Sequence, residues 1–290
     1  MLQDTPRAAN PRAPSESAVL EQAGHENFPV ASRLLPADVR TDLLAIYGFA
    51  RLVDDIGDEV EGDRLELLDW LDEELERSRE GEATHPLMQR LTPTIRRHSL
   101  SLEPFRALIA ANRQDQIVTS YETLDDLIEY CMLSAAPVGQ LVLAVFGAAT
   151  PERVALSDNV CNGLQVVEHL QDIAEDAAQG RVYLPREVME RHGCKREDVF
   201  AARATPALAR AVAEAGAFAR KLLRSGAPLS KSLTLRPRAA VAGFTAGGLA
   251  ALDEIERVGF DTLANRCRPR KSRLARNWIG VLAGRAGQVS

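Results

Sequence analysis

The chain has 290 residues, of which 46% are hydrophobic and 26% charged, as in a soluble globular protein large enough to bury a sizeable core. Its formal net charge of −6 gives no general support to nucleic-acid binding, and it contains neither a Walker loop nor a dinucleotide-binding glycine motif. Four separated cysteines without a CxxC pair or a signal peptide suggest no zinc site and fit a reducing cytoplasm. Because alanine, leucine, glutamate and arginine dominate, the composition favours an all-α fold.

The N-terminal part of the chain changes from irregular to periodic near residue 25. Residues 1–24 mix Pro, Ala, Arg, Ser and Glu without apolar periodicity, which predicts a disordered tail. One helical domain is expected over residues 25–275, followed by a short tail over residues 276–290. Its first long helix should begin after Pro36, since apolar positions recur at helical spacing over residues 39–59.

An acidic cluster lies near the end of this helix. Asp54 and Asp58 are four residues apart, so a helix places them on one face, and Arg51 lies one turn earlier, where it can brace the cluster. Gly57 costs roughly 1 kcal/mol of helix propensity, so it marks either a loosened turn or a close approach of another group to the backbone. The cluster is either a cation site or a surface with simple ion pairs.

Three further helices are predicted over residues 64–80, 86–98 and 105–119. In the last of them, four polar residues lie on adjacent turns and are either exposed or line a polar cavity: Asn112, Arg113, Asp115 and Gln116.

Residues 124–147 also have a helical pattern, which Pro137 interrupts. A proline inside a helix removes one backbone hydrogen bond and kinks the axis. The kink either opens space for a bulky apolar ligand or is a tolerated packing feature. The apolar stretches over residues 133–150 and 239–252 are short or broken, so neither is predicted to span a membrane.

A second acidic cluster lies on a helix that we predict to run without a break over residues 152–178. Glu168, Asp172 and Asp176 are four residues apart and share one face of it. Like charges at this spacing destabilise an isolated helix by roughly a few tenths of a kcal/mol per pair, so a compensating cation is expected. Oxygen ligands suit Mg²⁺, and the alternative is a solvated acidic face.

Two acidic helices that faced each other would form a negative cleft, which is costly unless it holds cations. Two or three Mg²⁺ ions there would bind a diphosphate and stabilise the charge that develops as it departs. The rest of a helical bundle would be apolar and would suit hydrocarbon chains and a carbocation. The basic run over residues 266–273 is dense enough for a phosphate clamp, or it is a solvated tail; it lacks the aromatics of a nucleic-acid patch.

Three stretches resemble the squalene/phytoene synthase family. Residues 47–58 are similar to its first aspartate-rich motif, and residues 164–185 to its second motif and the segment after it. Residues 28–36 resemble the segment that helps the family to hold diphosphate. The resemblance spans residues 25–275 and implies a single-domain isoprenoid synthase helical bundle around a central apolar cavity.

The resemblance also implies a site. Its Mg²⁺ ligands would be the carboxylates of Asp54, Asp58, Glu168, Asp172 and Asp176. Its substrate contacts would come from Ser32, Arg33, Tyr47, Arg51, Gln165, Arg181 and Tyr183. The four aspartates, Arg51 and Tyr183 would be the catalytic residues, and Tyr47 and Tyr183 would steer a cation with the faces of their rings.

Within the family, residues 26–31 and 134–139 resemble the hydroxysqualene synthase branch of bacterial hopanoid biosynthesis. This branch implies ionisation of presqualene diphosphate, rearrangement of the cation and capture by water, without NADPH. Relatives would instead condense two farnesyl or geranylgeranyl diphosphates head to head. The implied setting is the cytoplasm, with peripheral membrane contact and functional coupling to other hopanoid-pathway enzymes left open.

Three positions depart from the family pattern. Glu168 stands where Asn is frequent and adds a charge to the metal face, whereas Gln171 stands where Arg is frequent and removes a cation. Ala136 stands where the branch would have Asn, an amide that could position the water that captures the cation.

Two alternatives are not enzymes: a silent relative that acts as an assembly factor, and an acidic helical interaction module. The presence of both acidic clusters argues against a silent relative.

Overall fold

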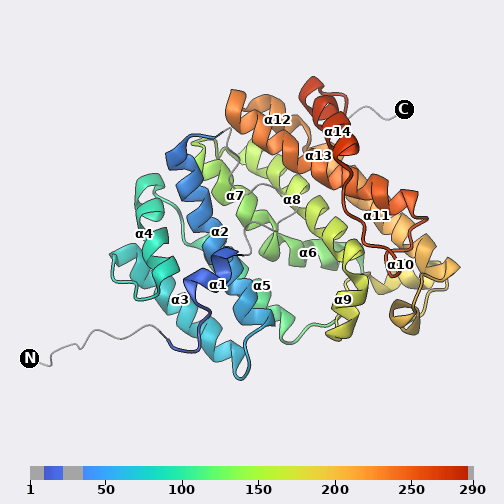
Figure 1. Ribbon diagram of the computed structural model, residues 1–290, viewed down its shortest axis with the longest axis horizontal. Helices are drawn as coiled ribbons and strands as arrows, with labels where there is room; N and C mark the ends of the chain where they lie inside the picture. Colours follow the sequence, from blue (N-terminus) through green and yellow to red (C-terminus); the bar gives the residue numbers. More distant parts are fainter. Residues whose placement is uncertain (1–9, 22–34, 287–290) are drawn as a thin grey trace, which may run out of the picture. The chain divides into compact units, whose positions relative to one another are not determined.

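The computed structural model describes residues 10–21 and 35–286, which divide into two compact units, residues 1–116 and residues 117–290. Both units are built from helices (Figure 1). Over the described ranges no strand forms, and a single isolated bridge joins Ser120 to Val182. The all-α prediction is therefore confirmed.

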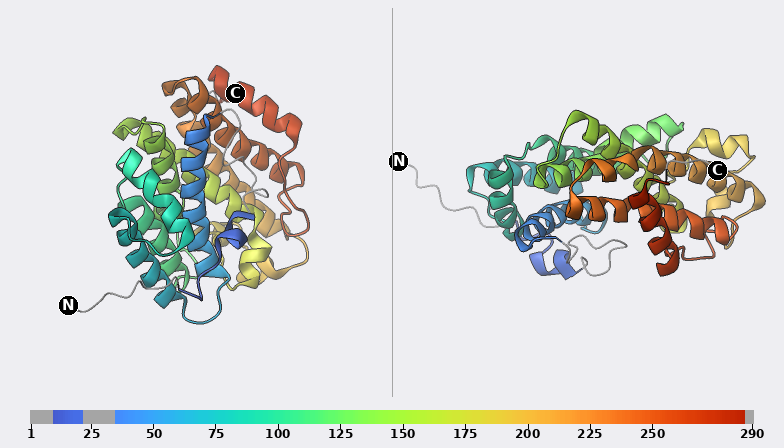
Figure 2. Two further views of the ribbon diagram at one scale, coloured as in Figure 1. Left: turned by 60° about the vertical axis from the view of Figure 1, so that its left-hand side comes forward. Right: turned by 90° about the horizontal axis from the view of Figure 1, so that it is seen from above.

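The N-terminal unit is organised around one long helix, α2. Its helices are α1 (Glu16–Glu21), α2 (Ala37–Asp58), α3 (Arg64–Glu80), α4 (Pro86–His98) and α5 (Glu103–Asp115). Helices α3, α4 and α5 pack on α2, which buries Phe49, Leu52 and Ile56 completely (Figure 2). Phe49 meets Phe105 of α5 edge to face, with ring centroids 5.0 Å apart. These contacts fix the direction of the α2 face that carries the first acidic cluster.

The predicted disordered tail over residues 1–24 is wrong for residues 10–21. Helix α1 contacts α2 and buries Val19, and Arg12 donates a hydrogen bond to Glu66 of α3 over 2.7 Å. A helix of six residues is too short to leave a periodic signal, so its formation depends on tertiary contacts. Ser32 and Arg33, both predicted to hold substrate, lie outside the described residues.

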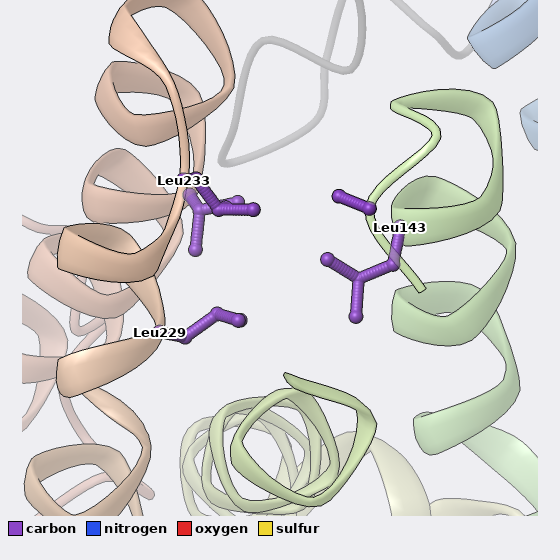
Figure 3. Close-up of a cluster of buried hydrophobic side chains, with 5 residues drawn as sticks. Leu143, Leu229 and Leu233 are labelled. Carbon is purple, nitrogen blue, oxygen red and sulfur yellow. The ribbon is translucent and has the colours of Figure 1, made fainter. Parts of the chain in front are cut away.

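The C-terminal unit is organised around α8. Its helices are α6 (Leu124–Ser134), α7 (Ala136–Val145), α8 (Pro151–Gln171), α9 (Ile173–Ala178), α10 (Arg186–Arg191), the 3₁₀-helix η2 (Arg196–Phe200), α11 (Pro206–Gly226), α12 (Pro228–Ser232), α13 (Leu235–Arg257) and α14 (Lys271–Ala283). Helices α7, α11 and α13 pack on α8. Glycine lets α11 approach closely, because a Cβ on Gly226 would lie 2.6 Å from the carbonyl oxygen of Leu156. One part of the core brings Leu143 of α7 toward Leu229 and Leu233 (Figure 3).

Two of the predicted helices are interrupted. The pattern over residues 124–147 forms α6 and α7, which meet at Ala135 two residues before Pro137, so the predicted kink is present. The helix predicted without a break over residues 152–178 ends at Gln171 and restarts at Ile173, so that prediction is wrong at Asp172. The residues at this break keep helical hydrogen bonds, from the amide of Asp172 to Glu168 and from that of Asp176 to Asp172.

Residues Leu124–Val145 are long and apolar enough to cross a membrane by length and composition. Half of the apolar window is buried inside the structure, and the break at Ala135 divides it, as in a core helix.

The structure also differs from the tail predicted over residues 276–290. Helix α14 continues to Ala283 and packs against α13 (Figure 1). Trp278 on α14 donates from its indole nitrogen to the carbonyl of Ala239 over 2.9 Å, which docks the helix.

Candidate active site

The first acidic cluster occupies the last two turns of α2. Asp54 and Asp58 are exposed on one face, whereas Asp55 is buried. The Nε of Arg51 lies 2.7 Å from Oδ1 of Asp55, and the guanidinium also reaches Glu59 at 3.0 Å. Arg51 therefore braces the cluster through Asp55, whereas Asp54 and Asp58 share the neighbouring, exposed face of the helix. Tyr47, one turn before Arg51, is half-buried.

Asn112 of α5 is one of the four polar residues that the sequence left either exposed or lining a cavity, and it contacts this cluster. The side chain is buried, and Nδ2 donates to Oδ1 of Asp54 over 3.2 Å and to the carbonyl of Leu108. Gln116 donates to the carbonyl of Gly57 over 3.1 Å. A Cβ on Gly57 would lie 2.0 Å from Oδ1 of Asn112, so the glycine is required by this close approach.

The second acidic cluster straddles the break between α8 and α9. Glu168 is exposed, whereas Asp172 and Asp176 are half-buried. Asp172 has φ −105° and ψ 15°, outside the helical region, so the carboxylates are not on one regular helix face as predicted. Oδ2 of Asp176 is buried without a hydrogen-bond partner and lies 3.7 Å from Nδ1 of His169.

An aromatic cluster lies next to Asp176 of the second acidic cluster, within the same unit. The ring of His169 stacks on Tyr183, and Tyr121 stacks on Tyr183 with centroids 5.8 Å apart. Tyr130 completes the group at 5.6 Å from Tyr183. We call these four residues the aromatic cluster. The sequence did not single out Tyr121, Tyr130 or the stacking of His169, because only the fold brings these segments of the chain together.

The predicted residues Asp176, Arg181 and Tyr183 do converge. Together with His169 they line a pocket of about 10 Å³ in the C-terminal unit, about the size of one water molecule. Gln165 joins them through its amide nitrogen, which lies 3.3 Å from Nε2 of His169.

Burial opposes the charge on two of the predicted metal ligands. Desolvation by surrounding protein atoms raises the pKa of Asp54 to about 7, although part of the residue is exposed at the helix surface. The hydrogen bond from Asn112 and the charge of Arg51 act in the other direction and limit this rise. Burial also raises the pKa of Asp172 to about 6, with a further rise from the charges of Glu175 and Asp176. The surrounding protein groups therefore do not fully compensate the cost of ionising these two carboxyls.

These donors fit Mg²⁺ in their chemistry. All five are carboxylates, the oxygen ligands that Mg²⁺ prefers, and Asp176 contributes a buried oxygen without a hydrogen-bond partner. In the part of the chain that the structure describes, no three His, Cys, Asp or Glu side chains form a group that could hold a metal ion.

Comparison with known proteins decides the family. The family model for squalene/phytoene synthase matches residues 22–275. The chain belongs to the squalene/phytoene synthase family. It is an enzyme of the squalene synthase type, as the resemblance in the sequence predicted.

Two of the most similar relatives are named hydroxysqualene synthase. The hydroxysqualene synthase of Rhodopseudomonas palustris is 39% identical over 217 residues, which are 72% of this chain and 71% of the relative. The hydroxysqualene synthase of Zymomonas mobilis is 34% identical over 226 residues, 75% of this chain and 74% of the relative.

Solved structures agree on the fold. The crystal structure of squalene synthase HpnC from Alicyclobacillus acidocaldarius is 42% identical with a TM-score of 0.78, and the match covers 83% of this chain and 92% of that one. A dehydrosqualene synthase with a bound ligand has a TM-score of 0.82 at 22% identity, covering 92% and 95%, and supports the fold alone. The family processes prenyl diphosphates of the farnesyl type.

Proposed function

We propose that this enzyme converts presqualene diphosphate to hydroxysqualene with release of diphosphate, in a Mg²⁺-dependent reaction of hopanoid biosynthesis. The observation that carries the proposal is the similarity, at 34–39% identity over about three quarters of the chain, to three relatives named hydroxysqualene synthase. The carboxylates, arginines and tyrosines that the reaction would use are all present, and two of the carboxylates have raised pKa values.

The proposed roles follow from local chemistry. Mg²⁺ bound by Asp54, Asp58, Glu168, Asp172 and Asp176 would supply Lewis-acid stabilisation of the departing diphosphate. Arg51 and Arg181, with Ser32 and Arg33, would bind the diphosphate oxygens, for which guanidinium groups are suited. Gln165 would orient His169 and the substrate through its amide.

The aromatic cluster would handle the hydrocarbon part of the substrate. The ring faces of Tyr183 and Tyr47 would attract a developing carbocation without reacting with it. The mutual stacking of Tyr183, Tyr121 and His169 holds the Tyr183 ring in one orientation and excludes water from that side.

A second candidate is the head-to-head condensation of two farnesyl diphosphates to presqualene diphosphate and squalene. Two observations favour it: the solved relative at 42% identity is named squalene synthase, and Ala136 is a buried methyl group that offers no amide to water. Geranylgeranyl diphosphate would be the substrate of the corresponding condensation to phytoene, the activity named for more distant relatives.

Mass analysis of products separates these functions. The purified enzyme is incubated with presqualene diphosphate and with farnesyl diphosphate, each with and without NADPH and with Mg²⁺ or EDTA. Hydroxysqualene from presqualene diphosphate without NADPH supports the proposal. Squalene formed only with NADPH contradicts it in favour of the condensing reaction. No diphosphate release from either substrate would instead support an assembly role.

The proposed setting is the cytoplasm, where water is the second substrate and no nucleic acid takes part. Peripheral contact with a membrane would give the enzyme access to its lipid-like substrate and product, and would allow coupling to the next hopanoid-pathway enzyme. Fractionation of cells into soluble and membrane pools tests this part of the proposal.

A further inference from the structure

A groove runs between α11 and α13, which lie side by side in the C-terminal unit (Figure 1). It encloses about 450 Å³, within the range of roughly 300–1,000 Å³ that is usual for small-molecule sites. Among the described residues, none of the predicted metal ligands and no member of the aromatic cluster lines it. From α11 it receives three small residues and three cations: Ala213, Gly216, Ala217, Arg220, Lys221 and Arg224.

The groove has an apolar end and a basic end. A Cβ on Gly248 would lie 2.8 Å from Leu223, whereas a Cβ on Gly216 would lie 3.5 Å from Leu252. Helices α11 and α13 are therefore antiparallel. Phe260 follows the end of α13, so it lines the groove at the N-terminal end of α11, beside the small residues. The three cations lie toward the C-terminal end of α11.

The charges at the basic end are only partly neutralised. Arg220 pairs with Asp253 at 3.0 Å and with Glu256 at 3.3 Å, so it engages both of these carboxylates. In the part of the chain that the structure describes, neither Lys221 nor Arg224 has a carboxylate within ion-pairing distance. Side chains three residues apart on a helix are neighbours, about 5–6 Å apart at Cβ, so these two cations can bind one phosphate group together.

The basic end faces away from α8. Gly226 marks the face of α11 that packs on α8, because a Cβ on it would lie 2.6 Å from the carbonyl oxygen of Leu156. Successive residues of a helix are about 100° apart around its axis, which places Lys221 about 140° and Arg224 about 160° from Gly226. An anion on these two cations is therefore on the opposite side of α11 from the helix that leads to the second acidic cluster.

The apolar end is held by an unusual backbone conformation. Phe260 has a φ of 62°, in the left-handed region that bulky residues rarely adopt, and its amide donates to the carbonyl of Ile255 over 2.9 Å. This conformation fixes the half-buried Phe260 ring at the end of the groove. Backbone strain of this kind is concentrated at ligand-binding and functional sites.

We propose that the groove between α11 and α13 binds a single anionic amphiphile, with its phosphate group on Lys221 and Arg224 and its apolar chain lying along the groove toward Phe260. The two cations without carboxylate partners select the anion, and the small and apolar lining residues accommodate the chain. This site is separate from the acidic clusters and does not depend on the proposed reaction.

Dodecyl phosphate, kept below its micelle concentration in EDTA, tests the basic end without Mg²⁺. We expect one molecule to bind per chain in calorimetry. The double variant Lys221→Gln/Arg224→Gln should bind it at least about tenfold more weakly, because it loses charge-assisted hydrogen bonds. The control, Lys195→Gln/Arg236→Gln, removes two exposed cations of the same unit outside the groove and should bind like the wild type. Equal affinity of the first double variant and the wild type overturns the proposal.

Chain length tests the apolar end. Dodecyl phosphate should bind more tightly than butyl phosphate, by up to about fourfold for each additional methylene group that is buried. Ala217→Phe fills the groove and should weaken dodecyl phosphate about tenfold while leaving butyl phosphate nearly unchanged. Ala202→Phe, an exposed change outside the groove, is its control. Equal affinity for the two phosphates overturns the chain site.

Vesicles and turnover separate this site from two others. If phosphatidylglycerol vesicles sedimented the protein but monomeric dodecyl phosphate did not bind, the groove would be a membrane contact and the proposal would fail. The variant Lys221→Gln/Arg224→Gln should keep the kcat of the wild type; turnover that fell in parallel with binding would place the amphiphile in the active site and overturn the proposal. A wild type that turned over no prenyl diphosphate would refute the proposed function, while binding in EDTA would still decide the groove.

Discussion

The imidazole of His169 lies on the phenol ring of Tyr183, with ring centroids 3.7 Å apart and ring planes inclined by 12°. His169 belongs to α8, and Tyr183 to the extended segment that follows α9. The stack therefore closes the stretch of chain that contains the break at Asp172 and the carboxylate of Asp176. Because the loop is closed by this contact, the orientation of two predicted metal ligands depends on it.

This stack predicts a measurable coupling. Aromatic pairs are worth about 0.5–1.5 kcal/mol beyond the area that they bury. A double-mutant cycle with His169→Ala and Tyr183→Ala, followed by urea unfolding, should give a coupling free energy of about 1 kcal/mol. The matched cycle of Tyr183→Ala with His192→Ala, a histidine that pairs with Glu214, should give a value near zero. Coupling absent from both cycles would show that the stack does not stabilise the site.

Gly57 predicts a steric effect on the first acidic cluster. In Gly57→Ala the new Cβ would lie 2.0 Å from Oδ1 of Asn112, which must move and so loses its hydrogen bond to Asp54. Overpacking of this kind costs about 1–3 kcal/mol. We expect a lower urea midpoint and a loss of turnover larger than that of Gly180→Ala, whose Cβ would meet nothing within 4 Å but whose backbone is strained by its φ of +84°. Unchanged stability of Gly57→Ala would contradict the close approach.

The raised pKa values of Asp54 and Asp172 predict how the metal-free protein responds to pH. A carboxyl whose folded pKa exceeds its ordinary value of 3.8 binds more protons in the folded than in the unfolded state. Stability should therefore fall as pH rises from about 4 to about 7, the range between the ordinary and the folded pKa values. Asp54→Asn and Asp172→Asn should melt at higher temperature than the wild type at pH 8 in EDTA.

The same variants give the control for this pH effect. Their advantage in melting temperature should shrink as pH falls and vanish below the ordinary pKa of 3.8, where the wild-type carboxyls are protonated in both states. Addition of Mg²⁺ at pH 8 should raise the melting temperature of the wild type and not that of the variants, since a ligand stabilises only the state that binds it. A wild type that melts higher than both variants in EDTA at pH 8 would refute the unfavourable charge.

Asp42 predicts the opposite pH dependence in the N-terminal unit. It is buried on α2 and accepts hydrogen bonds from Thr94 at 2.9 Å, Arg97 at 2.8 Å and His98 at 2.8 Å, all on α4. Burial raises its pKa, but the hydrogen bonds from His98, Thr94 and Arg97 outweigh burial and hold the pKa below its ordinary value. The stability from Asp42 is therefore full above the ordinary pKa and is lost as pH falls through the folded one.

Asp42→Asn tests this carboxylate. Because hydrogen bonds to charged groups contribute about 1.5–3 kcal/mol, we expect a loss of about 2 kcal/mol at pH 7 in urea unfolding, shrinking below pH 4. Asp38→Asn, an exposed change on the same helix, is the control and should have little effect at either pH. A loss for Asp42→Asn that did not diminish in acid would place its origin outside the carboxylate charge.

The periodicity of apolar residues predicted the long helices that carry the candidate site. It did not predict the short helix α1 or the break at Asp172. The spacing of apolar residues predicted the long helix that became α2, because burial of one face imposes a regular repeat. It missed α1, which has six residues and is held by contacts with α2 and α3. It also missed the break at Asp172, since a bend of one residue does not change which positions are apolar. Arg51 was predicted to brace the cluster. Only the structure showed that its ion-pair partners are Asp55 and Glu59.

The amino-acid order by itself determined the helical class, the kink near Pro137 and the two acidic motifs, because each depends on residues within a few turns of one another. Tertiary structure alone decided that Asn112 reaches Asp54, that His169 covers Tyr183 and that Gln171 holds the carbonyl of Cys267. These contacts join residues 58, 14 and 96 positions apart. Partners at such separations are chosen by the packing of whole helices, which no local pattern records.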